Sequence, residues 1–314
     1  MSKTSDALIS LGYRAGWAAA GKVPEGLAYR IADLAADRAM ARRGPAVVRY
    51  ARNLSRVLGD RATPRRLHEV TAAGLRSAAR FWLETFRLPS MDHDEVAARS
   101  LSETTGMEHI GAAVAAGRGM VLALPHCGNW DVAGLMLAHE YGSLTSVAER
   151  LKPESLYRKF LEFRQSLGME ILPLTGGATP TSTLLKERLR AGGVVCLLGD
   201  RDLTASGVPV TFFGEPTRMP AGPAMLAALT GADLCVVDLS FTRNGSEWGW
   251  KHTITPPIEL PGTRLAERVK LGTQAIATEF ERGISRHPQD WHMLSPLWLA
   301  DLPAGHAALP GVDR

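Results

Sequence analysis

The chain has 314 residues, of which 45% are hydrophobic and 22% charged, and its net charge is +4. This balance is ordinary for a soluble globular protein and excludes the disordered and fibrous classes. No stretch reaches the roughly 18 apolar residues that cross a bilayer. The apolar segment 7–21 is interrupted by Arg14 and two internal glycines, so we do not expect it to be a signal peptide. We therefore expect a protein that does not cross a membrane by itself.

Cysteine and histidine usage gives no sign of a metal or a cofactor. The three cysteines lie far apart in apolar stretches, without a CxxC pair, and none of the nine histidines has the HExxH spacing. The pattern favours unpaired thiols in a reducing cytosol. The cysteines are Cys127, Cys196 and Cys235.

Arginines are concentrated in the first quarter of the chain. They form either a solvated helical face or a basic surface for anionic lipid headgroups, where each cation contributes about 1 kcal/mol. Nucleic acid would also attract this charge, but the aromatic residues that stack on bases are missing, so we expect no nucleic-acid partner. The arginines are Arg38, Arg42, Arg43, Arg49, Arg52, Arg56, Arg61, Arg65 and Arg66.

The first hundred residues are predicted to be helical. One helix ends at Gly44-Pro45, a second runs from Pro45 to about Gly59, and a third follows Pro64 and continues to Leu88. The third carries an apolar stripe at helical spacing, which is typical of a core face, and its charged residues lie off that stripe. The stripe is Leu75, Ala79, Trp82, Leu83 and Phe86, and the charged residues are Arg76, Arg80, Glu84 and Arg87.

A second apolar set near the N-terminus has two interpretations. With Arg14 and Lys22 nearby, it would form a helical patch that lies in the lipid headgroup layer, or it would pack onto the core. The set is Leu8, Ile9, Leu11, Trp17, Leu27 and Ile31.

After residue 100, short apolar runs alternate with helical patterns, which predicts an α/β fold with a central, mostly parallel sheet flanked by helices. We expect one domain over residues 1–314, with a helical portion (1–100) and an α/β catalytic core (101–300). The predicted strands are 119–125, 144–148, 169–174, 194–198, 208–213, 234–242 and 251–258, and the predicted helices are 131–141, 154–167, 181–191, 221–230 and 265–287.

A histidine directly follows the first of these strands, in the run Pro125-His-Cys-Gly-Asn-Trp-Asp131. Open α/β sheets bind ligands at the carboxyl ends of their strands. Asn129 is placed to cap the next helix, and Asp131 would lie in its first turn. Because His126 precedes that helix, the loop can fold back and bring the Asp131 carboxylate to the imidazole. Such a pair can take a proton from a substrate hydroxyl.

This HxxxxD spacing also occurs by chance, as a surface histidine near a capping aspartate. A thiol nucleophile at Cys127 is a second alternative, although neighbouring residues usually point in different directions.

Several short motifs follow one another in order over roughly residues 70 to 300. They are Arg80-Phe-Trp-Leu-Glu84, Pro125–Asp131, Ala148–Glu154, Arg164 with Gly168, Gly199-Asp-Arg-Asp202, Thr211–Gly214, Pro220–Pro223 and His287-Pro-Gln-Asp-Trp291. Together these segments resemble the lysophospholipid acyltransferase superfamily, and within it the bacterial lipid A biosynthesis acyltransferases and their phosphatidylinositol mannoside branch.

The resemblance implies an acyl-CoA-dependent O-acyltransferase that moves a fatty acyl group, typically palmitoyl. The donor would be acyl-CoA, with acyl carrier protein as an open alternative. The acceptor would be the 6-hydroxyl of the inositol 2-linked mannose of phosphatidylinositol mannoside. The enzyme would act peripherally at the cytoplasmic face of an actinobacterial cell membrane, where the surface is anionic.

The resemblance also assigns roles to site residues. His126 would be the general base and Asp131 its orienting partner. Glu149, Arg164, Asp200 and Arg201 would bind substrate, with the Asp200 carboxylate near the histidine. Arg201 and Asp202 could instead support the loop, and Arg164 and Asp200 could form a structural ion pair.

Two other functions stay open. One is a transferase acting on lipid A or another lysolipid. However, Phe213-Gly-Glu-Pro-Thr-Arg218 matches the phosphate-binding FPEGTR segment of glycerophosphate acyltransferases only loosely. The other is a non-catalytic membrane-binding protein, which would have no need of a base at a strand end.

Overall fold

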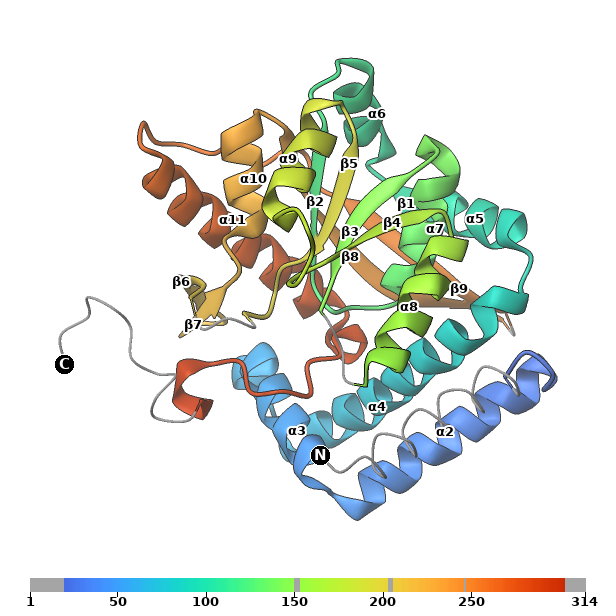
Figure 1. The fold of residues 1–314 in the computed structure, drawn as a ribbon. Helices are drawn as coiled ribbons and strands as arrows, with labels where there is room; N and C mark the ends of the chain where they lie inside the picture. Colours follow the sequence, from blue (N-terminus) through green and yellow to red (C-terminus); the bar gives the residue numbers. More distant parts are fainter. Residues whose placement is uncertain (1–19, 150–152, 203–205, 246, 303–314) are drawn as a thin grey trace.

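The computed structural model describes residues 20–149, 153–202, 206–245 and 247–302. A central sheet of seven strands has the order β1-β9-β8-β2-β5-β3-β4 (Figure 1). Every neighbouring pair is parallel except β8 and β9. The strands are β1 (Thr104–Thr105), β2 (Met120–Leu124), β3 (Leu144–Ala148), β4 (Met169–Pro173), β5 (Val194–Leu198), β8 (Asp233–Asn244) and β9 (Glu247–Ile254).

The predicted α/β fold with a mostly parallel sheet is confirmed. Strand β2, whose sequence is one continuous apolar run, is buried along its whole length between β5 and β8. This agrees with the rule that strands of parallel sheets are covered on both faces.

One predicted strand lies elsewhere than in the central sheet. Residues 208–213 form β6 (Val208–Phe212), which pairs only with β7 (Glu215–Met219) in a separate hairpin. Phe213 and Gly214 both have positive φ, at 49° and 77°, as the two-residue turn of a hairpin requires. The stretch that resembles the phosphate-binding segment therefore builds this hairpin.

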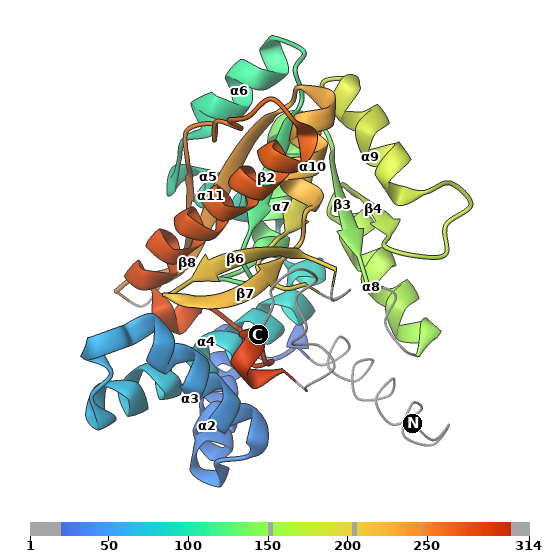
Figure 2. The same cartoon turned by 90° about the vertical axis from the view of Figure 1, so that its left-hand side faces the viewer.

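Helices cover both faces of the sheet (Figures 1 and 2). Right-handed crossovers place α7 and α8 on one face, and α5 packs beside α7. The other face is covered by α9, α10 and α11, and α10 contacts both of its neighbours. The helices are α5 (His93–Ser102), α6 (Met107–Ala115), α7 (Trp130–Tyr141), α8 (Glu154–Ser166), α9 (Thr181–Arg190), α10 (Gly222–Thr230) and α11 (Leu265–Arg286).

The three predicted N-terminal helices are present as α2 (Glu25–Arg42), α3 (Pro45–Leu58) and α4 (Pro64–Arg87). Proline begins α3 and α4, where its missing N–H costs nothing. The three helices bury a small apolar cluster of their own. Figure 1 shows α4 running below the carboxyl ends of the sheet strands.

Helix α4 differs from the prediction in which face it buries. Arg80 and Glu84, predicted to lie off the core stripe, are 5% and 1% exposed, whereas Trp82 of that stripe is 40% exposed. The burial is tolerated because the two side chains form an ion pair of 2.6 Å, and the Arg80 guanidinium lies over the rings of Phe241 and Trp248.

Of the predicted N-terminal apolar set, Leu27 and Ile31 lie within the described residues. Leu8, Ile9, Leu11, Arg14 and Trp17 lie outside the described residues. Leu27 and Ile31 on α2 are about half exposed, so they do not pack onto the core. Within the described part of the chain, no helix is long and apolar enough to span a membrane.

One buried histidine makes the stability of the fold depend on pH. His252 on β9 contacts Ser100 Oγ at 2.9 Å, and burial lowers its pKa to about 4. The histidine of the unfolded chain binds a proton at about pH 6.5. The contribution of the neutral, buried His252 to the free energy of unfolding is therefore fully present above that pH and is lost as the pH falls toward 4. We expect the free energy of unfolding to fall by about 2 kcal/mol more between pH 7.5 and pH 5 in the wild type than in His252→Gln. Urea unfolding at both pH values measures this, and equal losses in the two proteins would contradict it.

Candidate active site

His126 lies in the loop between β2 and α7, and the pairing of two strands determines its partner. Leu124, the last residue of β2, is in register with Leu198, the last residue of β5. The Gly199 N–H extends the pairing with a 2.8 Å bond to the Leu124 carbonyl. His126 and Asp200 therefore leave the same sheet edge side by side.

The chain that leaves β2 crosses over β5 to reach β3, and the chain that leaves β5 crosses over β2 to reach β8. The two connections therefore leave this pair of strands in opposite directions. Ligands of open α/β sheets bind at such a point.

Asp200 holds both the ring and the backbone of His126. Its Oδ1 lies 2.5 Å from His126 Nδ1, and its Oδ2 accepts the His126 backbone N–H at 2.9 Å. Asp200 is fully buried. Burial alone would raise the pKa of its carboxyl, but the charge on His126 and the hydrogen bonds from His126 and Trp291 outweigh that effect and hold the pKa below its usual value. Asp200 is therefore ionised at neutral pH.

An ionised Asp200 determines the tautomer of the imidazole. The carboxylate can only accept, so His126 Nδ1 carries the hydrogen and Nε2 of the neutral ring is free to accept a proton. Nε2 has no partner among the described residues, and the side chain is 28% exposed. The ring can thus work as a base toward a substrate above the sheet edge.

Asp131 does not have the partner that the sequence suggested. We expected it to orient His126, but its Oδ1 accepts from Arg164 Nε at 2.8 Å. Asp131 lies in the first turn of α7 and Arg164 in the last turn of α8, and these two helices lie on the same face of the sheet. The predicted cap is present: Asn129 Oδ1 accepts the backbone N–H groups of Asp131 and Val132. The ion pair that we considered for Arg164 thus forms with Asp131 and not with Asp200.

The other predicted site residues lie on the same edge of the sheet. Glu149 follows β3 and Arg201 follows Asp200, and both are exposed. Asp202 supports its loop, as one interpretation predicted, by accepting the Gly207 N–H at 2.7 Å. The strand order places Glu149 two strands away from His126.

Cys127 is not available as a nucleophile. It is 1% exposed, and burial together with the carboxylates of Asp238, Asp200 and Asp290 raises the pKa of its thiol well above the usual value. A thiol that stays protonated in an apolar interior is inert.

The loop that carries His126 is fixed from three sides. Glu84 of α4 accepts from Asn129 Nδ2 at 2.7 Å, and the same carboxylate accepts from Trp250 Nε1, Tyr29 Oη and Arg80 Nε. Gly128 has a φ of +53°, and a Cβ there would lie 3.1 Å from the backbone of β8. On the third side, the Gly128 N–H donates to the Asp290 carbonyl and the His126 carbonyl accepts the His292 N–H.

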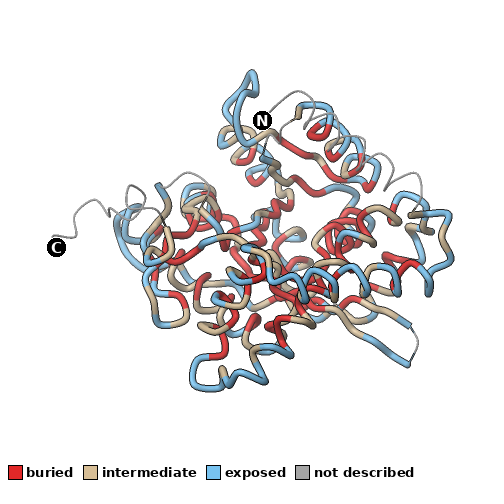
Figure 3. Tube along the Cα trace, turned by 90° about the horizontal axis from the view of Figure 1, so that it is seen from below, coloured by how far each residue is buried: buried red, intermediate tan, exposed pale blue. Residues whose placement is uncertain are grey.

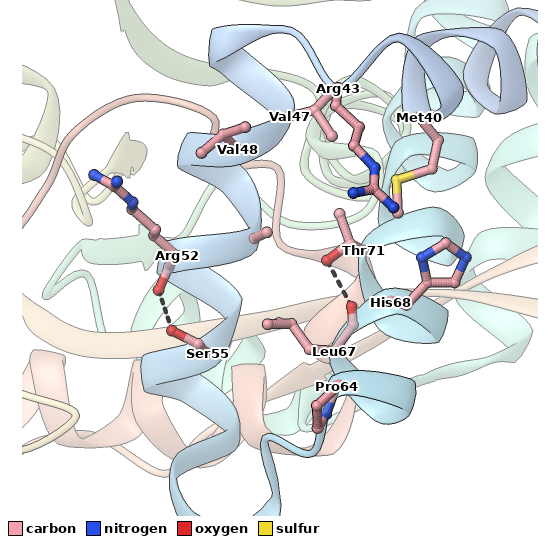
Figure 4. Close-up of a pocket in the computed structure, with 11 residues that line it drawn as sticks. Met40, Arg43, Val47, Val48, Arg52, Ser55, Pro64, Leu67, His68 and Thr71 are labelled. Carbon is pink, nitrogen blue, oxygen red and sulfur yellow. Dashed lines mark hydrogen bonds between the residues drawn. The ribbon is translucent and has the colours of Figure 1, made fainter.

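Two cavities among the described residues differ in position and size. A small one of about 50 Å³ lies between α7, α8 and the sheet, lined by Trp130, Asp131, Arg164 and apolar side chains. A larger groove of about 410 Å³ lies between α3 and α4, away from every predicted site residue (Figure 4). Among the described residues, no group of three His, Cys, Asp or Glu side chains could hold a metal ion.

Comparison with known proteins identifies the family of the chain. The model of the bacterial lipid A biosynthesis acyltransferase family matches residues 1–300. The chain belongs to that family. Two relatives are both named phosphatidylinositol mannoside acyltransferase. The chain is 47% identical to one from Mycobacterium tuberculosis over 298 residues, 94% of this chain and 90% of the relative. It is 47% identical to one from Mycolicibacterium smegmatis over 293 residues, 93% of this chain and 92% of the relative. The predicted family and the prediction of an acyltransferase are confirmed.

Two of the residues that hold the site lie in segments that resemble the family, but the sequence did not indicate a role for either of them. Glu84 and Trp291 each end a segment that carries the family resemblance. What they contact is a matter of three-dimensional packing, because their partners are distant in the chain.

The Asp131–Arg164 pair gives a stability prediction. Asp131 is 1% exposed, so Arg164→Met leaves a buried charge without its partner, and we expect a loss of about 3 kcal/mol in the free energy of unfolding at pH 7. The matched control is Arg188→Met, which breaks the exposed pair with Glu170 and should cost less than about 1 kcal/mol. Urea unfolding compares them, and similar small losses would contradict the structural importance of Asp131–Arg164.

Proposed function

We propose that this enzyme transfers a fatty acyl group from acyl-CoA to a mannose hydroxyl of phosphatidylinositol mannoside, with His126 as the general base and Asp200 as the residue that orients it. The observation that carries the proposal is the 2.5 Å contact between His126 Nδ1 and the buried Asp200. The names of the two mycobacterial relatives support the acceptor class.

In the proposed reaction, His126 carries one proton from the acceptor to the leaving group. His126 Nε2 takes the proton from the sugar hydroxyl while the hydroxyl oxygen attacks the thioester carbonyl, forming a C–O bond. The C–S bond then breaks, and the departing CoA sulfur takes the proton from the imidazolium. Asp200 stabilises the imidazolium between these steps without becoming protonated. The acceptor would be the 6-hydroxyl of the inositol 2-linked mannose and the acyl group palmitoyl, as the resemblance implies.

The substrates would meet at the carboxyl edge of the sheet. The exposed carboxylate of Glu149 and the exposed guanidinium of Arg201 supply polar groups for a sugar headgroup beside His126. Apart from the Asp131–Arg164 pair, the small cavity between α7, α8 and the sheet is lined mainly by apolar side chains. We therefore propose that the acyl chain enters there. About 50 Å³ holds only a few methylene groups, so side chains must move aside. Met169 is a flexible lining residue that contacts Gly134 and can give way.

The test is an acyl-transfer assay with the full chain, palmitoyl-CoA and detergent-dispersed phosphatidylinositol mannoside, with products identified by mass spectrometry. We expect His126→Ala to lower kcat about 1000-fold and Asp200→Asn to lower it at least 100-fold, because an amide cannot fix the same tautomer. Asp131→Asn should cost much less than Asp200→Asn.

No transfer by the wild type would refute the enzyme hypothesis, and full activity in His126→Ala would refute the mechanism. A larger loss in Asp131→Asn than in Asp200→Asn would return the orienting role to Asp131. Replacing acyl-CoA with acyl carrier protein identifies the donor. Acylation of lysophosphatidate or lipid A precursors, but not of the mannoside, would favour the lysolipid alternative.

We also propose that the helical portion lies against an anionic membrane on the cytoplasmic face. Between Lys22 and Arg87 there are 14 lysines and arginines against six aspartates and glutamates, a net charge of +8 compared with +4 for the whole chain. The floor of the groove in Figure 4 is apolar and includes Met40, Val47 and Leu67. The guanidinium of Arg43 reaches over this floor, and that of Arg52 points outward. Neither guanidinium has a partner in the described part of the chain. These groups suit the headgroup and upper acyl chain of an anionic lipid.

Vesicle co-sedimentation tests this surface. We expect Arg43→Glu/Arg52→Glu to weaken binding to vesicles with 30% phosphatidylglycerol by roughly tenfold or more, since each cation contributes about 1 kcal/mol. Binding to phosphatidylcholine vesicles should be weak for all variants. Lys251→Glu/Lys270→Glu makes the same charge change on exposed positions of β9 and α11 and should retain most binding. Equal losses in both double variants would show that only net charge matters.

A further inference from the structure

Trp291 contacts the proposed catalytic pair, although its side chain is completely buried. Its Nε1 donates to Asp200 Oδ2 at 2.9 Å. Oδ1 of the same carboxylate faces the His126 ring, and Oδ2 also accepts the His126 backbone N–H. The indole is therefore the only side chain besides His126 that bonds to Asp200 within the described residues.

The segment around Trp291 is tied to the catalytic loop on both sides of the indole. Before it, the Asp290 carbonyl accepts the Gly128 N–H at 2.9 Å; after it, the His292 N–H donates to the His126 carbonyl at 2.8 Å. Trp291 itself forms an antiparallel bridge with Cys127. The loop and this segment thus move as one piece.

The N-terminal helices hold the same segment from the other side. Asn53 of α3 donates to the carbonyls of Met293 and Ser295, at 2.7 and 2.9 Å. Ser77 of α4 donates to Asp290 Oδ1 at 2.7 Å, and the other oxygen of that carboxylate accepts the Phe241 N–H. These bonds leave the indole little freedom to turn away from Asp200.

The ring itself is held by aromatic neighbours. Phe212, Phe213 and Trp298 lie around it, with ring centroids 6.0, 6.5 and 6.1 Å away. Packing alone would account for a large apolar ring here. It does not account for the polar edge of the indole meeting a buried, ionised carboxylate, since a phenylalanine ring would fill most of the same space.

We propose that Trp291 is a positioning residue, whose indole N–H holds the Asp200 carboxylate in the orientation that fixes His126 and limits how strongly that carboxylate retains the histidine proton. This inference rests on the proposed function. A hydrogen bond to an ionised acceptor stabilises the charged form. Without the indole donor, Asp200 becomes more basic, holds the imidazolium more firmly, and leaves the ring less well oriented.

The variant Trp291→Phe removes the N–H and keeps an aromatic ring. We expect kcat for palmitoyl transfer to fall about tenfold, which is the scale of one charge-assisted hydrogen bond, with both KM values within about twofold. The acid limb of the kcat/KM profile should move upward by roughly half a pH unit, because the imidazolium is held more tightly. A loss of packing alone would not move that limb.

Trp298→Phe is the matched control. Trp298 is as buried as Trp291, and its Nε1 donates at the same 2.9 Å, but to the backbone carbonyl of Phe212. The phenylalanine keeps an aromatic ring beside Trp291, and the lost N–H does not reach Asp200, so we expect an unchanged acid limb and a kcat within about twofold of the wild type. An acid limb that stays in place in Trp291→Phe, or moves equally in both variants, would overturn the proposal. Absence of transfer by the wild type would refute the proposed function instead.

A measurement on the wild type covers the case in which Trp291→Phe does not fold. With indole-¹⁵N tryptophan, the resonance of the Trp291 Nε1–H should shift with pH in step with the acid limb of activity, and the Trp298 resonance should not. His126→Ala should abolish the pH-dependent shift. A Trp291 resonance that does not respond to pH, or that responds equally in His126→Ala, would show that the indole is not coupled to the pair.

Discussion

The parallel pairing of β2 with β5 is the constraint on which the rest of the site depends. It is set by two short apolar runs that end in register, and it brings the first polar residues after each strand to one edge. A ladder of this kind cannot shift by one residue without turning buried side chains to the opposite face. The spacing between His126 and Asp200 is therefore as fixed as the core, although 74 positions separate them in sequence.

The helical portion and the segment near the C-terminus add a second layer of support. Glu84 fixes the amide of Asn129, which caps α7, and Asn53 and Ser77 fix the segment that bears Trp291. A preorganised site needs its catalytic groups held by neighbours whose own positions are locked. This explains why the helical portion is also part of the structure of the site: its α3 and α4 supply buried hydrogen bonds that the α/β core alone lacks.

Much of the fold could be predicted from the sequence, because periodicity reports directly on burial. The strands 144–148 and 194–198 end where predicted. Two predictions about the fold were wrong because they depended on contacts between residues that are distant in the chain. Arg80 and Glu84 are charged, so their pattern indicated an exposed face, and only their mutual pairing and distant partners make burial tolerable. The run 208–213 has strand character, but composition does not tell which strand it will pair with.

The predicted site residues differ from the structure in how the two carboxylates are paired, and their positions in the sequence show why. Asp131 is close to His126 in sequence, which favours it in any local argument. Asp200 becomes a neighbour only after the sheet forms. The electrostatics then separate their roles: Asp131 faces Arg164, a permanent cation, whereas Asp200 faces an imidazole that takes up and releases a proton in the proposed reaction. A carboxylate already paired with a permanent cation has less to gain from an imidazolium. The arrangement therefore places the ring whose charge changes in the reaction beside Asp200, and the permanent cation beside Asp131.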